Sequence, residues 1–228
     1  MTSTEPKHRL VLFDLDGTLA DTAPDLAYAL NQTLIRQGKP ELPFPAIRPH
    51  VSHGGLALIR LGFGIEPEDP RFDALRQEFL DIYLANLTRE TRLFPGMDEV
   101  LSSLETAAIP WGIVTNKPSW LTDPLMQQMA RTDRAVAIVS GDTTDNRKPH
   151  PEPILYACKK AAVEPAGTLY IGDAQRDIEA GNRAGATTLT ALFGYIGETD
   201  TPESWGADGT LSSPREILSW VTANPQSF

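Results

Sequence analysis

Cysteine is almost absent from this chain of 228 residues, in which Cys158 is the sole example. An internal disulfide is therefore excluded, and we expect a reducing, cytoplasmic compartment. Cys158 lies in a helical pattern, which favours a small buried apolar side chain over a nucleophile. Runs of 18 apolar residues are also absent, and the segment MTSTEPKHRL lacks the apolar stretch of a signal peptide. We therefore expect no membrane span.

Positive charge is scarce as well. Lys and Arg total 20 against 30 Asp and Glu, which gives a net charge of −10. Nucleic acids and anionic membranes bind basic faces, so neither is an expected partner. A P-loop motif is missing too. A small anionic ligand would need a local cation in its site, either a lysine or a metal ion.

Short apolar runs alternate with helical patterns over most of the sequence. The alternation predicts an α/β fold with a mostly parallel, doubly wound sheet. Residues 23–92 depart from it, because they contain three helical patterns and no convincing strand, which predicts an inserted all-helical domain. The expected strands are 10–13, 111–114, 135–139, 168–171 and 187–192, and the expected inserted helices are 25–37, 45–62 and 71–88.

Two aspartates follow the first apolar run directly. In FDLDGTLADT, Asp14 and Asp16 are two residues apart, and Gly17 signals a chain reversal at the strand end. Side chains at this spacing on a strand point the same way. An EF-hand is excluded, since its loop needs glycine at the sixth position and glutamate at the twelfth. Taken alone, the segment is also typical of a plain polar turn.

Three later segments follow three further apolar runs. VTNK at 114–117 offers a hydroxyl and an amide suited to phosphate oxygens, although a helix N-cap is an alternative explanation. RKPHPEP at 147–153 holds Lys148 among prolines, as a rigid exposed loop would also do. GDAQRD at 172–177 spaces two acids four residues apart, which is also common at helix N-termini.

Four such features at four successive strand ends are hard to explain by chance, because the ends of parallel strands converge on one crevice. A cluster of carboxylates there would be unstable without a cation, and oxygen ligands without His or Cys favour Mg²⁺. Lys148 and Thr115 would bind an anion beside the metal. Together these features suggest phosphoryl transfer. The clustered acids would be Asp14, Asp16, Asp173 and Asp177.

The four segments, in this order, resemble the motifs of the haloacid dehalogenase-like phosphatases. The resemblance covers nearly the whole chain and implies a Rossmann-like core of residues 1–22 and 93–228 with a helical cap of residues 23–92. It implies that Asp14 is the nucleophile, which forms an aspartyl-phosphate, and that Asp16 is first the general acid and then the general base.

The same resemblance implies the remaining site residues. Thr115 and Lys148 would stabilise the phosphoryl group, and Thr18 and Asn116 would contact the substrate. Mg²⁺ would be held by Asp14, the backbone carbonyl of Asp16, and Asp173, with Asp177 in support.

Finer features are similar to those of phosphoglycolate phosphatases, including a subgroup with N-acetylmuramic acid 6-phosphate phosphatases. They are the stretches VSHGG, TNKP, KPHPEP and GYIGETDTPESWGAD. The resemblance favours 2-phosphoglycolate as the small phosphomonoester substrate, with N-acetylmuramic acid 6-phosphate as the alternative. The expected assembly is a monomer or a homodimer. We expect a cap loop to contact the substrate's carboxylate through Ser52, His53, Gly54 and Gly55.

Other activities are less compatible with the sequence. A dehalogenase would not need Asp16 as an acid, and a phosphonatase would need a cap lysine, for which Lys39 in a turn is a poor candidate. A sugar phosphomutase and a phosphate-ester sensor without catalysis remain as alternatives.

Overall fold

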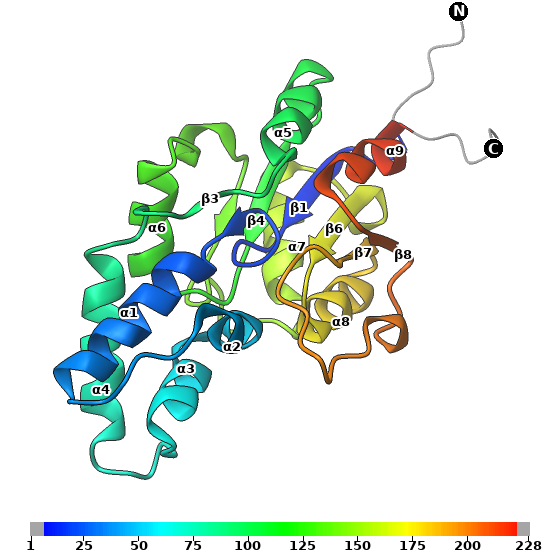
Figure 1. Cartoon of the computed structure of the whole chain (residues 1–228). Helices are drawn as coiled ribbons and strands as arrows, with labels where there is room; N and C mark the ends of the chain where they lie inside the picture. Colours follow the sequence, from blue (N-terminus) through cyan, green and yellow to red (C-terminus); the bar gives the residue numbers. More distant parts are fainter. Residues whose placement is uncertain (1–6, 223–228) are drawn as a thin grey trace, which may run out of the picture.

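A six-stranded sheet forms the centre of the computed structural model, which describes residues 7–222 (Figure 1). Its strand order is β5-β4-β1-β6-β7-β8, and each neighbouring pair is parallel. The predicted α/β class with a doubly wound sheet is confirmed. The strands are β1 (Leu10–Phe13), β4 (Trp111–Val114), β5 (Ile138–Val139), β6 (Thr168–Gly172), β7 (Thr187–Ala191) and β8 (Gly209–Leu211).

Helices cover both faces of the sheet, which explains the unbroken apolar sequence of β1. Leu10 and Leu12 pack with α7 and α8, whereas Val11 and Phe13 belong to the cluster that includes α5, α6 and α9. All four side chains are fully buried. The core helices are α5 (Met97–Thr106), α6 (Ser119–Gln128), α7 (Glu152–Ala161), α8 (Gln175–Ala184) and α9 (Ile217–Thr222).

Residues 23–92, hereafter the cap, lie beside the carboxyl end of the sheet (Figure 1). They form α1 (Ala23–Arg36), α2 (Phe44–Ile47), the 3-10 helix η1 (Arg48–His53), α3 (Gly54–Phe63) and α4 (Phe72–Leu84). The single helix expected over 45–62 is wrong. A 3-10 segment begins at Arg48, and Gly54, with φ 74° and ψ −172°, leaves the helical region between η1 and α3.

A short antiparallel pair marks where the chain enters and leaves the cap: β2 (Ala20–Asp21) lies against β3 (Arg92–Leu93). One hydrophobic cluster continues from the sheet into the cap helices, so the two parts share buried apolar surface. Among the described residues, no helix is long and apolar enough to cross a membrane. The ends of the predicted core, 1–6 and 223–228, lie outside the described residues.

Two strand expectations need correction. The strand expected over 135–139 shrinks to Ile138–Val139, because a 3-10 turn, Thr132–Arg134, precedes it. β8 was not expected, since it has three residues and pairs at the sheet edge with β7. Short strands of this kind carry too few residues for an alternating pattern.

We predict that Asp25→Ala lowers the free energy of unfolding by about 1–3 kcal/mol, because it leaves buried backbone N–H groups without an acceptor. The Asp25 carboxylate accepts the backbone N–H groups of Glu90 at 3.1 Å and Thr91 at 2.9 Å, and it therefore clamps the start of α1 to the chain returning to the core. Denaturant unfolding checks this. Asp73→Ala, an exposed acid in the first turn of α4, is the matched control. Equal effects of the two substitutions would contradict the clamp.

Candidate active site

The sheet topology brings three of the sequence motifs to one place. β1 lies between β4 and β6, so the residues that follow these strands are neighbours in space. Asp14 follows β1, Thr115 follows β4, and Asp173 follows β6. All three are buried. Lys148 arrives from the loop between β5 and α7, so all four predicted strand-end segments meet at the carboxyl end of the sheet.

Asp14, Asp173 and Asp177, hereafter the acid trio, each offer a carboxylate oxygen within 4.8 Å of the others. None is more than 3% exposed. The atoms that the trio offers to a metal are all carboxylate oxygens, and Mg²⁺ prefers oxygen ligands. The trio therefore fits the predicted metal. The Asp16 carboxylate does not belong to this group, and the metal contact of its backbone carbonyl remains a prediction.

Burial and the charges of neighbouring acids govern the protonation of Asp14 and Asp173. Burial, together with the charge of Asp177, raises the pKa of Asp14 to about 6, although Lys148 acts in the opposite direction. Burial and the charges of its two neighbours raise the pKa of Asp173 to about 7. The site therefore carries more negative charge than its protein cations balance, which is the condition that a divalent metal would relieve.

Gly17 lets the backbone approach the trio. Its φ is +84°, and a Cβ built there would lie 2.1 Å from Asp173 Oδ2. A side chain at this position would displace the acid. The predicted chain reversal at Gly17 therefore forms part of the wall of the carboxylate site, and this position requires glycine.

The Lys148 ammonium is the central cation of the site. Nζ lies 2.9 Å from Asp14 Oδ1 and 2.7 Å from Asp177 Oδ1. It also donates to Val114 O at 2.7 Å and lies 3.0 Å from the Tyr170 hydroxyl. An ammonium has three protons, so these four partners occupy it fully. Lys148 is thus held on the Asp14 side of the site.

The Asp16 carboxylate contacts another lysine, Lys117. Its two oxygens accept hydrogen bonds from Lys117 Nζ at 2.8 and 3.0 Å, and Oδ1 also accepts from Thr22 Oγ1. Burial lowers the pKa of Lys117, but the charge of Asp16 and the contact with Tyr83 outweigh it, so the pKa is raised overall. We did not assign Lys117 from the sequence, although it is the last residue of the VTNK segment.

Asn116 and Thr18 hold other site residues in place. The Asn116 amide donates to Lys148 O at 2.9 Å and accepts from Lys148 N at 3.0 Å, so both its polar atoms serve the lysine backbone. Thr18 is fully buried, and its hydroxyl lies 3.5 Å from Asp173 Oδ1. The predicted substrate contacts of these two residues remain predictions.

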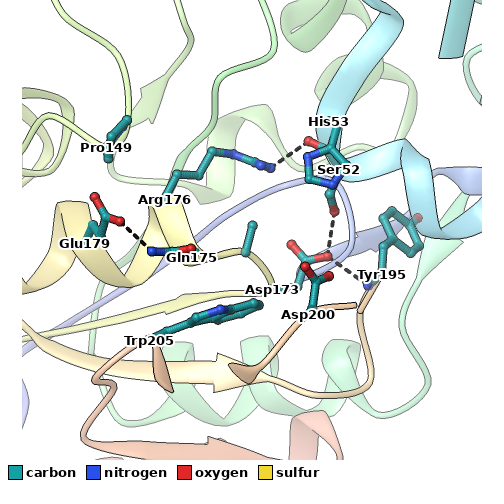
Figure 2. A pocket seen from close by; sticks show the side chains of 11 residues that line it. Ser52, His53, Pro149, Asp173, Gln175, Arg176, Glu179, Tyr195, Asp200 and Trp205 are labelled. Atoms are coloured by element: carbon teal, nitrogen blue, oxygen red, sulfur yellow. Dashed lines mark hydrogen bonds between the residues drawn. The ribbon is translucent and has the colours of Figure 1, made fainter. Parts of the chain in front are cut away.

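The cap reaches the acid trio through η1. Ser52 Oγ donates to Asp173 Oδ2 at 2.9 Å, and Ser52 O accepts from Arg176 Nη2 at 2.7 Å (Figure 2). A cavity of about 300 Å³ lies at this junction, with Ser52, His53 and Asp173 in its wall. Figure 2 shows Arg176 and Trp205 lining it from different sides. Burial, then the charge of Arg176, lowers the pKa of His53.

The two cap glycines lie just beyond this cavity wall. Gly54 and Gly55 form the first turn of α3, and Gly54 is exposed. A Cβ at Gly55 would lie 3.2 Å from the Phe79 ring. Of the four predicted cap-loop residues, Ser52 and His53 line the cavity, whereas a ligand contact by the glycines remains a prediction.

Three further residues of the site were missed. Tyr170 lies in an apolar strand, yet its hydroxyl contacts Asp177 Oδ1 at 3.2 Å. Arg176 lies within the GDAQRD segment, where its positive charge was a usable signal. Tyr195 donates its backbone N–H to Asp173 Oδ2 at 2.9 Å. No signal in the sequence marked either tyrosine: Tyr170 has the pattern of a core residue in an apolar strand, and Tyr195 is separated from Asp173 by 22 positions.

Comparison with known proteins gives a consistent picture. A family model described as haloacid dehalogenase-like hydrolase matches residues 11–191. An N-acetylmuramic acid 6-phosphate phosphatase of Pseudomonas putida is 41% identical over 92% of this chain and 94% of its own. A phosphoglycolate phosphatase of Xanthomonas campestris is 40% identical over the same shares.

A solved structure extends the likeness to the fold. The crystal structure of a predicted phosphoglycolate phosphatase from Haemophilus somnus has a TM-score of 0.82, at 27% identity, over 93% of this chain and 97% of that one. The family model covers most of the chain, and the first relatives match nearly its whole length. The chain therefore belongs to the haloacid dehalogenase-like hydrolases.

Proposed function

We propose that the chain is a Mg²⁺-dependent phosphomonoester hydrolase that works through an aspartyl-phosphate. The observation that carries this proposal is the contact of Lys148 Nζ with Asp14 Oδ1 at 2.9 Å inside the acid trio. A buried carboxylate between a metal site and a fixed ammonium suits attack on a phosphoryl group, because both cations offset the charge of the two reacting anions.

In this mechanism the Asp14 carboxylate attacks phosphorus, and the bond from phosphorus to the ester oxygen breaks. Asp16 gives its proton to that oxygen as the alcohol leaves. Asp16 then takes a proton from a water molecule, whose oxygen attacks the phosphorus of the aspartyl-phosphate and releases inorganic phosphate. Lys148 and Thr115 stabilise the transferred group. When bound at Asp14, Asp173 and the Asp16 carbonyl, with Asp177 in support, Mg²⁺ supplies charge neutralisation and orients the phosphoryl oxygens.

2-Phosphoglycolate is the first candidate substrate, since it is small, anionic and matches the name of several relatives. N-acetylmuramic acid 6-phosphate is the second. It is favoured by two relatives that carry this name and by the cavity of about 300 Å³ with Trp205 in its wall, which is larger than glycolate needs. Comparing kcat/KM for the two esters on the purified protein with Mg²⁺ decides between them.

We predict that Asp14→Asn reduces turnover of every phosphomonoester by at least about 10³-fold, because an amide cannot attack phosphorus as an anion. The fold should persist, and thermal stability should hold or rise, since one of three crowded charges is removed. Steady-state rates and thermal unfolding measure the two effects. Asp145→Asn, an exposed acid of the adjacent loop, is the control. Substantial turnover by Asp14→Asn would exclude the covalent mechanism.

We predict that Asp16→Ala slows alkyl phosphates by about 10²–10⁴-fold and slows an aryl phosphate with a good leaving group far less. The reason is that an alkoxide needs a proton to leave, whereas a stabilised phenolate does not. Parallel kcat/KM measurements on both esters check this. Equal losses on the two would contradict the role of Asp16 as the acid.

The raised carboxyl pKa values predict how metal and pH affect stability. The unfolded chain ionises these carboxyls near about pH 4, whereas the folded protein does so at about 6 for Asp14 and about 7 for Asp173. The metal-free fold therefore binds more protons than the unfolded chain between these values, and its stability falls as pH rises through that window. Mg²⁺ should consequently raise the melting temperature more at about pH 8 than at about pH 5.

Thermal unfolding in chelator and in Mg²⁺ at both pH values checks this prediction. Asp173→Asn should raise the melting temperature of the metal-free protein at high pH and should weaken the response to Mg²⁺. Asp200→Asn changes an acid of the same cavity that lies outside the trio, and it should behave as the unmodified protein does. A response to Mg²⁺ that is the same at both pH values would show that the trio is purely structural.

A further inference from the structure

We infer that Lys117 determines specificity: it binds a carboxylate placed next to the ester oxygen of the substrate. The inference rests on the proposed function, because it uses Asp16 as the residue that contacts the leaving oxygen. It adds a recognition site for the leaving group, which the acid trio and Lys148 do not supply.

The first step of the argument is position. A group that exchanges a proton with Asp16 lies within about 2.6–3.2 Å of its carboxylate. Lys117 Nζ lies 2.8 and 3.0 Å from the two oxygens of that carboxylate. An ester oxygen held by Asp16 and the atoms bonded to that oxygen are therefore close to Lys117. The side chains of Asp16 and Lys117 are 17% and 7% exposed, so the pair is largely enclosed.

The second step is that the three cations near the site occupy different positions in it. Lys148 is fully buried and its four partners lie on the Asp14 side, so it is placed for the transferred phosphoryl group and not for the leaving group. Arg176 contacts the cap at Ser52 O and lines the cavity beside Asp173. Among these three cations, Lys117 is the one in contact with Asp16.

The third step is the cap side of the pair. Tyr83 of α4 is fully buried, and its ring centre lies 4.8 Å from Lys117 Nζ. The Tyr83 hydroxyl lies beside the Lys117 ammonium, but its own proton has no acceptor within residues 7–222. Burying a hydroxyl proton without an acceptor is unfavourable, and a carboxylate bound at Lys117 would offer it one. The core, through the Lys117 ammonium, and the cap, through the Tyr83 hydroxyl, therefore both present hydrogen-bond donors beside Asp16.

The fourth step is the length of the leaving group. In 2-phosphoglycolate the carboxylate carbon is two bonds from the ester oxygen, which is the separation that adjacent Asp16 and Lys117 require. In N-acetylmuramic acid 6-phosphate the lactyl carboxylate and the phosphate are attached at distant carbons of the sugar ring. Recognition by Lys117 thus selects phosphate esters of short α-hydroxy acids.

The experiment compares 2-phosphoglycolate with 2-hydroxyethyl phosphate, which replaces the carboxylate by a neutral alcohol. Turnover is measured as kcat/KM, and binding is measured by calorimetry in the Asp14→Asn background. Lys117→Met should lower the preference for the carboxylate ester by at least about tenfold in both measurements, while Lys117→Arg, which keeps the charge, should retain most of it. Melting temperatures establish that each variant is folded.

Two matched variants separate this role from a structural one. Thr22→Val removes the other side-chain donor to Asp16, so it should affect both esters by the same factor. Arg176→Met removes the cation of the cavity and should leave the preference intact. The inference is overturned if Lys117→Met affects both esters equally, if Arg176→Met abolishes the preference instead, or if the unmodified protein has no preference while hydrolysing both esters.

Failure of the proposed function would look different. In that case the unmodified protein would hydrolyse no phosphomonoester with Mg²⁺. The calorimetric comparison would still decide the role of Lys117: a loss of carboxylate preference in Lys117→Met supports it, and an unchanged preference overturns it.

Discussion

The burial of three carboxylates beside one lysine is the constraint on which the rest of this structure depends. Like charges in a low-dielectric site repel strongly, and each must be offset by a cation or by a hydrogen-bond donor. Lys148 offsets two members of the acid trio directly. Asp177 also accepts from Ala174 N at 3.0 Å, and Asp173 accepts from Tyr195 N at 2.9 Å. The surrounding backbone is thus arranged around these charges.

The cations near the site have separate positions, which gives them separate tasks. Lys148 is held at the trio, Lys117 at Asp16, and Arg176 between the trio and the cap. In a chain with a net charge of −10, these three cations offset part of the negative charge of the site, and a bound divalent metal would offset the rest for an anionic substrate. Exchanging one cation for another would therefore change which part of a substrate is recognised.

Much of the fold and the centre of the site were predictable, because both follow from local signals. Asp14, Thr115 and Asp173 each come directly after an apolar strand, and parallel pairing brings such positions together. The contact of Lys117 with Asp16 was not predicted, since it depends on how the two side chains are directed beyond their strand ends, which the spacing does not specify. Tyr170 was hidden because a tyrosine in an apolar strand is typical of a core residue. The break at Gly54 was hidden within a helical pattern, because its φ of 74° is a choice of backbone conformation that the pattern does not encode.

Tyr195 connects the site to the entry of the cap. Its backbone N–H donates to Asp173, while its hydroxyl accepts from Ala23 N at 2.8 Å and donates to Asp21 Oδ1 at 2.8 Å. Arg48 of the cap stacks on the same ring at 4.9 Å and donates to Gly194 O at 3.0 Å. A shift of Asp173 on binding a metal would thus be transmitted through Tyr195 to Asp21 and Ala23, where the cap begins. The Asp173 carboxylate also accepts from Ser52 Oγ, so the acid that would hold Mg²⁺ is the one that contacts the cap segment η1.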